Sequence, residues 1–330
     1  MAALLMWSFV ASLLPAALSL SPGLYGFDGS QACVYFFKNG TSMRIGPGVN
    51  SSRYVLSEGL STIDTPSATL YAIGLDKQTN SPVLFSIPLS TGAPSAAIAL
   101  PFGEVDDAIG AGQVIAFAAD AGLVIVGGVG VGGSTILATV DPFTQNVTVF
   151  AALPANVSVS LDTSQAAYFP STKTLVVLVT GVAPPYARLI AAVSLPTGGV
   201  ELLPNGHEPN VNTLDYDVVT GDVFGLGTSG SNDDDAARVT VRVSPDLKVT
   251  VVGSVHGYSD SLGGFSALDS DSRSIYWLGA ESGNDDGFYV LNVALTRNAT
   301  VLSAGLACAS SLSPSCPLTF EYYHGSGMGH

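Results

Sequence analysis

Turn signals recur along this chain at nearly equal steps, and this period restricts the fold more than any other feature of the sequence. The turns centre on Gly40, Gly92, Gln145, Gly198, Asp246 and Asn298. Successive centres are 52, 53, 53, 48 and 52 residues apart, and each lies between two short runs of β-branched or aromatic residues. A period near 50 residues that contains strands and turns is typical of β-propellers and related repeat arrays.

A second phrase precedes several of these turns. It consists of a small residue, an apolar residue and Asp, and it is followed by a strand-like run that ends in Gly. Residues 61–64 with 70–74, 212–215 with 223–227, and 266–269 with 275–279 show it clearly, and residues 159–162 and 123–127 show it more weakly. Each unit therefore contains four strands. We expect the phrase to form the innermost strand, the run ending in Gly the second, and the strands around the periodic turn the third and fourth.

These units predict an all-β, six-bladed propeller with four-stranded blades, formed by residues 21–323 as a single domain; a seven-bladed propeller is the alternative. Hydrophobic residues make up 47% of the 330 residues and charged residues 11%, so there is ample apolar surface to bury. The first unit is short, whereas 32 residues follow the last turn. We therefore expect the strand-like run 318–323 to complete the N-terminal blade, which would remove exposed sheet edges. Residues 324–330 are expected to form a flexible tail.

The N-terminus has the composition of a targeting segment. Residues 1–20 carry no charged side chain, and their only polar residues are Ser8, Ser12 and Ser19. This pattern predicts a signal peptide cleaved near residues 17–19, although no Lys or Arg precedes the apolar run. The alternative is an uncleaved membrane anchor, because about 20 apolar residues can span a bilayer.

Secretion would fit the N-glycosylation sequons, which begin at Asn39, Asn50, Asn146, Asn156 and Asn298. Three of them, at Asn39, Asn146 and Asn298, lie in or beside a periodic turn, so a propeller would place these three on one face near its outer edge. The competing interpretation is that Asn simply suits turns.

The chain has an odd number of cysteines, Cys33, Cys308 and Cys316. In a secreted protein two of them are expected to pair. Cys308 and Cys316 could close a small loop. A Cys33–Cys316 bridge would instead fasten the C-terminal strand to the first blade, and such a bridge contributes about 2–5 kcal/mol. Both pairings leave one cysteine free.

The strand and turn rhythm is accompanied by phrases such as Leu-Asp-Ser-Asp at 268–271 and Ile-Tyr-Trp at 275–277. In these respects residues 22–323 resemble the secreted propellers of the broad NHL-like and YVTN-type repeat class. The Gly-His and Trp-Asp marks of WD-type blades and the Ser-x-Asp-x-Gly-x-x-Trp box of sialidases are absent from the sequence. The resemblance therefore implies a fold and says little about activity.

Two acidic segments stand out among the links that join second to third strands. Residues 232–235 contain Asp233 and Asp234, and residues 284–286 contain Asp285 and Asp286. The segments are 52 residues apart, so neighbouring blades would present them at the same height. Asp and Asn oxygens suit Ca²⁺; the segments could equally attract a basic partner, or be ordinary loop residues.

Links between blades are expected to bring further polar residues to the propeller mouth. Six-bladed lactonases are similar in principle, because they hold one divalent ion with carboxylates and amides from several blades, and the ion acts as a Lewis acid on a lactone carbonyl. Glu58, Asn156, Asn210 and Asp260 could fill such a set, by position only. No Gly-x-Ser-x-Gly elbow occurs, so catalysis is the less favoured alternative.

The net charge of −15 argues against nucleic acids and anionic membranes as partners. The sequence thus predicts a secreted glycoprotein that serves as a binding or interaction module for an extracellular protein, glycan or small molecule. Its acidic loop face would be the ligand surface. The alternative is a Ca²⁺-dependent hydrolase of the lactonase type, and Ca²⁺ is the one cofactor that the residues suggest.

Overall fold

The structure is a computed structural model whose described elements are all β-strands. It describes residues 20, 22–28, 31–36, 41–103, 114–159, 166–183, 188–204, 210–229, 237–255, 258–259, 266–281, 288–295, 301–308 and 319–323. Within these ranges there is no helix that is long and apolar enough to cross a membrane. Of the expected leader only Leu20 is described, and it packs against the core of the first two sheets. The expected tail, 324–330, lies outside the described residues.

The strands form six antiparallel sheets. The first three have the four predicted strands, whereas the last three have five, because two short strands pair with the second strand in place of one continuous innermost strand. The first three sheets contain β27 (Thr319–Tyr323), β1 (Gly23–Asp28), β2 (Gln31–Phe36) and β3 (Thr41–Ile45); β4 (Tyr54–Asp64), β5 (Thr69–Asp76), β6 (Ser81–Pro88) and β7 (Ile98–Ala99); and β8 (Val114–Ala118), β9 (Leu123–Val129), β10 (Thr135–Val140) and β11 (Val147–Ala152). The last three contain β12 (Val157–Val159), β13 (Ala166–Phe169), β14 (Thr174–Gly181), β15 (Arg188–Ser194) and β16 (Val200–Pro204); β17 (Asn210–Val211), β18 (Asp215–Tyr216), β19 (Val223–Ser229), β20 (Ala237–Val243) and β21 (Val249–Val255); and β22 (Tyr258–Ser259), β23 (Ser266–Asp269), β24 (Ser274–Glu281), β25 (Phe288–Ala294) and β26 (Val301–Cys308).

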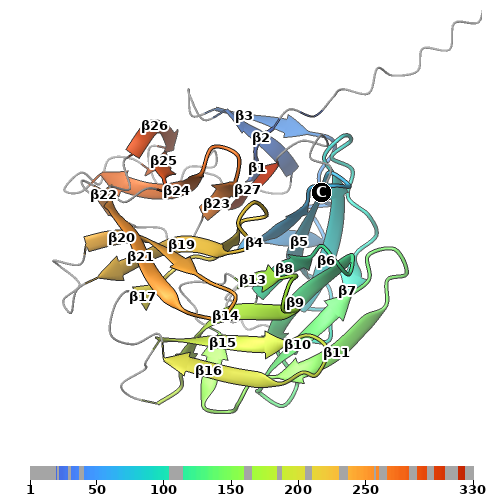
Figure 1. Cartoon of the computed structure of the whole chain (residues 1–330). Coiled ribbons are helices and arrows are strands. Elements are labelled where there is room, and N and C mark those ends of the chain that lie inside the picture. The colour runs from blue at the N-terminus through green and yellow to red at the C-terminus, as the bar shows by residue number, and fades with distance from the viewer. Residues whose placement is uncertain are drawn as a thin grey trace, which may run out of the picture.

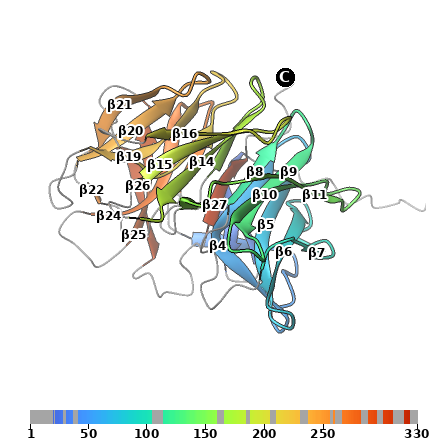
Figure 2. The same ribbon diagram turned by 90° about the horizontal axis from the view of Figure 1, so that it is seen from below.

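Contacts between sheets run around a closed circle. The strands β27, β4, β8, β13, β18 and β23 contact one another in that order, and β23 returns to β27. Figure 1 shows the sheets arranged around a common centre, with β27, β4, β8, β13 and β23 close to it, and Figure 2 shows the same sheets from below. The protein is therefore an all-β propeller, and the predicted assignment of each repeated phrase to an innermost strand is confirmed for β4 and β23.

The core lies between neighbouring sheets. Five clusters of buried apolar residues each join two consecutive sheets of the described part, from the first pair to the fifth. Strand β14 shows why the middle strands lack polar alternation: Leu175 and Val177 pack towards the third sheet, and Val176 and Leu178 towards the fifth. Because both faces of such a strand are buried, a nearly continuous apolar run results.

The C-terminal strand completes the first sheet, as the sequence predicted. β27 pairs antiparallel with β1, from Gly23 opposite Tyr323 to Phe27 opposite Thr319. Cys33 in β2 lies opposite Gly26, and Gly26 lies opposite Phe320. The backbone of β26 includes Cys308. The side chains of both cysteines, and all of Cys316, lie outside the described residues, so both disulfide pairings stay predictions.

The turns between first and second strands share one conformation. The residue just before the second strand has a positive φ at Ala68, Gly122, Lys173 and Arg273. The amides of Leu89, Leu195 and Leu295, each directly after a third strand, donate to the carbonyls of Ala68, Lys173 and Arg273. Asp64 and Asp269, which end the repeated phrase in the second and sixth sheets, cap this turn, because their carboxylates accept hydrogen bonds from residues two or three positions later.

The register corrects one alignment of the repeats. Asp64 lies opposite Thr69 and Asp269 opposite Ser274, at the turn end of the innermost strand. In the fifth sheet the corresponding turn residue is Asp217, whose amide donates to the carbonyl of Asp222. Asp217 and Asp222 enclose a turn of four residues, as Asp64 and Thr69 or Asp269 and Ser274 do, so the phrase at 212–215 ends two residues before the turn position of the other repeats.

The periodic turns bring neighbouring sheets into close backbone contact. Gly92 and Gly198 have positive φ values of 60° and 67°. A Cβ atom on Gly92 would lie 2.0 Å from the carbonyl oxygen of Ile45, and one on Gly198 would lie 2.3 Å from that of Phe150. Both carbonyls belong to the preceding sheet. Glycine is required at these turns by this approach as well as by the backbone conformation.

Candidate ligand face

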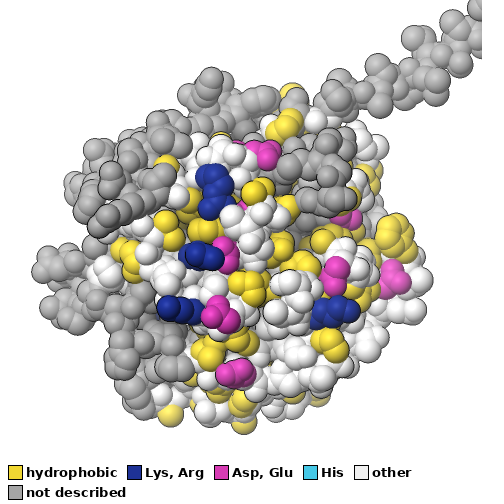
Figure 3. Space-filling model, viewed as in Figure 1, with side chains coloured by type: hydrophobic (Ala, Val, Ile, Leu, Met, Phe, Trp, Pro, Cys, Tyr) yellow, Lys and Arg dark blue, Asp and Glu magenta, His cyan; other side chains and the backbone are white. Residues whose placement is uncertain are grey.

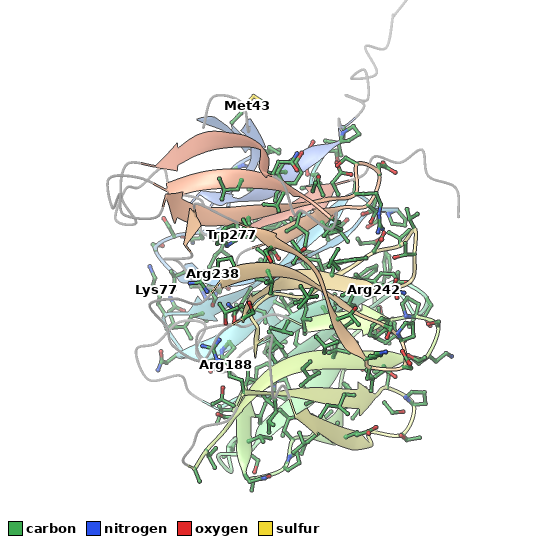
Figure 4. All side chains as sticks on the ribbon, turned by 60° about the vertical axis from the view of Figure 1, so that its left-hand side comes forward. Met43, Lys77, Arg188, Arg238, Arg242 and Trp277 are labelled. Carbon is green, nitrogen blue, oxygen red and sulfur yellow. The ribbon has the colours of Figure 1, made fainter. Side chains whose placement is uncertain are left out.

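Strand direction divides the surface into two faces. The turn face carries the turns between first and second strands, such as 65–68 and 270–273, and the periodic turns. The loop face carries the links between second and third strands, such as 77–80 and 230–236, and the links between sheets. Figure 4 shows the two faces on opposite sides: Lys77, Arg188 and Arg238 lie on one side, and Arg242 lies on the other.

The two acidic segments belong to links of the loop face. Residues 230–236 connect Ser229 to Ala237, which lie opposite each other, and residues 282–287 connect β24 to β25, where Ala280 lies opposite Phe288. These links leave the same end of neighbouring sheets. Asp233, Asp234, Asp285 and Asp286 themselves lie outside the described residues. Among the residues that the structure describes, no group of three or more His, Cys, Asp or Glu side chains could hold a metal ion.

The four residues considered for a lactonase-like set are described unequally. Glu58 lies in β4, within the stretch where the pairing with β5 shifts register between Leu56 and Ser61. Asn210 lies opposite Thr228, and its side chain, like that of Glu58, lies outside the description. Asn156 is exposed, and its carbonyl accepts a hydrogen bond from the amide of Val182. Asp260 lies outside the described residues, so the structure does not test whether the set converges.

Sequons occur on both faces. Asn50 and Asn156 lie in links of the loop face, before β4 and β12, whereas Asn146 lies in a periodic turn of the turn face. All three are exposed. Asn39 and Asn298 lie outside the described residues. The described sequons are therefore not confined to one face: Asn50 and Asn156 share the loop face with the ends of the acidic links, and Asn146 lies on the turn face.

Basic side chains on the loop face are held by neighbouring oxygens. The guanidinium of Arg53 pairs with Asp76 at 2.8 Å, and this interaction lowers the pKa of the Asp76 carboxyl and raises that of Arg53. The Nζ of Lys77 donates to the carbonyl of Ser51 at 2.8 Å. Arg188 reaches from the fourth sheet to Oδ1 of Asn212, which lies between β17 and β18 of the fifth, also at 2.8 Å. These contacts fix the ends of strands around the loop links.

These residues include a repeated Thr–Arg pair that was not predicted from the sequence. Arg188 lies opposite Thr180 in the fourth sheet, and Arg238 lies opposite Thr228 in the fifth. The same Thr–Arg pair thus begins two neighbouring third strands, and the arginines are 50 residues apart in the sequence. This spacing matches the turn period and was a usable signal. The repeat places both arginines on the loop face, near the start of the third strands β15 and β20.

Buried carboxylates connect the fifth and sixth sheets. Asp217 is fully buried; it accepts hydrogen bonds from the Val219 amide and the Thr220 hydroxyl, and it pairs with Arg273 of the sixth sheet. The Arg273 guanidinium lies 4.9 Å from the ring centre of Phe224.

On the turn face, Asp222 pairs with Arg242 at 2.7 Å. Figure 3 shows acidic and basic side chains interspersed in this way over one face of the molecule.

Asp215 is the one carboxyl in the described residues whose pKa is raised. Burial raises it to about 6, and the hydrogen bond from the Ser266 hydroxyl acts in the opposite direction. Ser266 belongs to the innermost strand of the next sheet. The raised pKa means that folding favours the protonated form, so the contribution of Asp215 to stability is present below pH 4 and is lost as the pH rises through about 6.

We therefore expect Asp215→Asn to stabilise the protein at neutral pH. The side chain of the introduced Asn carries no charge, and its carbonyl oxygen can still accept the hydrogen bond from the Ser266 hydroxyl. Part of the Asp215 surface is open to solvent, which screens the charge, so we expect a gain of about 1–2 kcal/mol at pH 7.5 that vanishes at pH 3.5. Urea unfolding between these pH values measures it. Asp141→Asn is the opposite control, because hydrogen bonds from Thr144 and Phe143 lower the pKa of Asp141. A gain from Asp215→Asn that does not change with pH would contradict the prediction.

Comparison with known proteins supports the fold. No protein-family model matches the chain, and no curated protein matches it. Solved structures do match. An oligogalacturonate lyase in complex with manganese is 13% identical, with 88% of this chain and 76% of that chain covered and a TM-score of 0.51. A putative TolB from Agrobacterium tumefaciens is 11% identical, with 90% and 94% covered and a TM-score of 0.51.

TolB from Acinetobacter baumannii is 12% identical, with 76% of this chain covered and a TM-score of 0.50. This chain spans about half of that protein's length, 55%. At such identities the likeness shows a shared β-propeller fold and assigns no family, because one fold serves many functions.

Proposed function

We propose that the protein is a secreted glycoprotein with six propeller blades, whose loop face is a binding module for an extracellular partner. The blade count is supported by the six sheets and by the circle of contacts among β27, β4, β8, β13, β18 and β23. Secretion is supported by the uncharged leader and by the exposure of the sequon residues Asn50, Asn146 and Asn156.

One observation carries the choice of face. On the turn face, carboxylates bind their own turns: Asp64 accepts from Ser67, Asp141 from Phe143 and Thr144, Asp217 from Val219 and Thr220, and Asp269 from Asp271 and Ser272. These carboxylates already accept hydrogen bonds within the turns that they stabilise. The loop face instead carries most of the longer links, such as 100–113 and 230–236. Binding residues are concentrated in links that a rigid scaffold positions.

The acidic segments provide oxygen ligands for a cation on this face. Asp233 and Asp234 in one link, and Asp285 and Asp286 in the link of the neighbouring sheet, offer hard oxygen ligands. We propose that they bind Ca²⁺ with the affinity of extracellular calcium modules, a dissociation constant of about 10⁻⁴–10⁻³ M. The ion would order the links that contact the partner.

Isothermal titration calorimetry of the full chain with CaCl₂ tests this proposal. We expect saturable heat that disappears when the four aspartates are replaced by Ala. The matched control is Asp246→Ala with Asp271→Ala, because both carboxylates are exposed on the turn face; this variant should bind Ca²⁺ as the parent does. Two outcomes would contradict the proposed calcium site. One is saturable Ca²⁺ binding by the variant that lacks all four aspartates, and the other is the absence of Ca²⁺ binding by the parent protein.

A screen of lactones and aryl esters tests the binding role itself. A binding module should turn over none of them above the background rate. Turnover that depends on Ca²⁺ and is lost in Glu58→Ala would overturn the proposal in favour of a hydrolase at the propeller mouth.

A further inference from the structure

The periodic turn of the third sheet is held rigid by its own residues. It joins β10 to β11, and the Asp141 amide donates to the carbonyl of Asn146 at 2.9 Å. The amide of Gln145 donates back to the carbonyl of Asp141 at 2.8 Å, and Gln145 has a φ of 61°. Oδ1 of Asp141 accepts from the amides of Phe143 and Thr144 at 2.9 and 3.1 Å. The turn is therefore a defined platform rather than a variable loop.

An aromatic ring lies uncovered on this platform. Phe143 is 85% exposed, and it is the one phenylalanine among the exposed large hydrophobic side chains of the described residues. Its amide is fixed by Asp141, so the backbone that carries the ring does not move freely. A single exposed apolar side chain needs no explanation by itself. Its position relative to the sequon is what gives it a role.

The sequon begins three residues after Phe143. Asn146 and Thr148 are both exposed, and Thr148 lies opposite Thr139 in the adjoining strand. Asn146 directly precedes β11, and Thr148 is the second residue of that strand. The hydrogen bond from the Gln145 amide to the Asp141 carbonyl closes one helical turn, and Phe143 lies within this turn. Phe143 and Asn146 are thus both exposed in one turn that is closed by the hydrogen bond between the Asp141 amide and the Asn146 carbonyl.

We propose that an N-linked glycan on Asn146 packs the apolar face of its first sugar on the ring of Phe143. The C–H groups of a pyranose meet the negative face of an aromatic ring favourably, and the contact removes apolar surface from water. The glycan thereby becomes a part of the third sheet that stabilises the fold. This inference rests on the proposed function in one respect, the passage of the chain through the secretory pathway.

The other described sequons lack this arrangement. The residue three positions before Asn50 is Pro47, and Oδ1 of Asn50 accepts hydrogen bonds from the amide and hydroxyl of Ser52 at 3.2 and 2.7 Å. The residue three positions before Asn156 is Leu153, which is buried. Glycans at these two sites should contribute to solubility without coupling to a neighbouring ring.

A double-mutant cycle on the full chain, secreted from a eukaryotic cell line, tests the contact. Glycopeptide mass spectrometry should find Asn146 occupied. Phe143→Ala should lower the melting temperature of the glycosylated protein by about 2–4 °C. In the Asn146→Gln or Thr148→Ala background, which lacks this glycan, the same replacement should leave the melting temperature unchanged. Trimming the glycan to its first sugar should preserve the stabilisation.

Val219→Ala is the matched control, because Val219 is also exposed, and its amide is likewise held by an aspartate two positions earlier, Asp217. It should show no dependence on the Asn146 glycan. An equal effect of Phe143→Ala with and without the glycan overturns the inference, as does an unoccupied Asn146 in a chain whose other sequons are occupied. A chain that is not secreted, with every sequon empty, overturns both the inference and the proposed function.

Discussion

A chain that stops after residue 318 should lose cooperative thermal unfolding and elute as an aggregate in size-exclusion chromatography. It lacks β27, which pairs along the whole of β1 except Asp28 and contacts the innermost strands β4 and β23. Without β27, β1 presents an unpaired edge to solvent and to other chains. The buried side chains of Leu24, Tyr25 and Phe27 would also lose part of their cover.

Two further chains make this prediction specific. A chain that stops after Tyr323 keeps β27 and should unfold like the full protein. Residues 319–323 can also be placed before Gly23 and joined to it by a copy of residues 270–273, which connect β23 to β24 at the same place in the sixth sheet. This rearranged chain should regain the cooperative transition. If the chain ending at 318 melts like the parent by circular dichroism, β27 does not have the structural role assigned to it.

Replacing Asp217 by Ala should destabilise the protein more than any other single carboxylate change in the described residues. The replacement removes the partner of Arg273 and the acceptor of the Val219 amide and the Thr220 hydroxyl. Removal of one member of a buried pair costs about 3–5 kcal/mol. The Arg273 side chain is 38% exposed and can turn to water, so we expect the lower limit, about 3 kcal/mol, and a melting temperature lower by about 6–10 °C.

Differential scanning calorimetry of matched variants measures this effect. Asp217→Asn should lose less, because its amide oxygen still accepts a hydrogen bond from the turn. Arg273→Ala should be about as harmful as Asp217→Ala, since it leaves the carboxylate buried without its cation. Glu201→Gln, an exposed change in β16, should melt like the parent. Equal melting temperatures for Asp217→Ala and Glu201→Gln would show that the pair does not fasten the two sheets.

The architecture was readable because a repeat imposes the same local chemistry many times. Each periodic turn needs a residue that tolerates a positive φ, and Gly92, Gln145 and Gly198 supply it at steps of 53 residues. The missing innermost strand of the first sheet was predictable from the short first unit. The close approach of Gly92 and Gly198 to the carbonyls of Ile45 and Phe150 was not predictable, because these carbonyls belong to the preceding sheets.

Single positions within a repeat were harder to assign. Asp215 matches the repeated phrase, yet Asp217 occupies the turn position of Asp64 and Asp269, because the turn of the fifth sheet begins two residues after the end of its phrase. The Thr–Arg pairs at Arg188 and Arg238 follow the period, but charged residues at strand ends carry no signal in a search for apolar runs. The cross-strand register aligns both features with the other repeats.

The amino-acid pattern alone was enough to specify the class of fold, the antiparallel pairing of successive strands and the closing role of the C-terminal strand, because turn chemistry and apolar runs act over a few neighbouring residues. Which side chains of different sheets meet depends on the folded arrangement. The Asp217–Arg273 pair, the hydrogen bond of Asp215 with Ser266 and the reach of Arg188 to Asn212 each join residues 24 to 56 positions apart. Such contacts depend on how twisted sheets stack around the centre, and no local preference of the chain specifies that geometry.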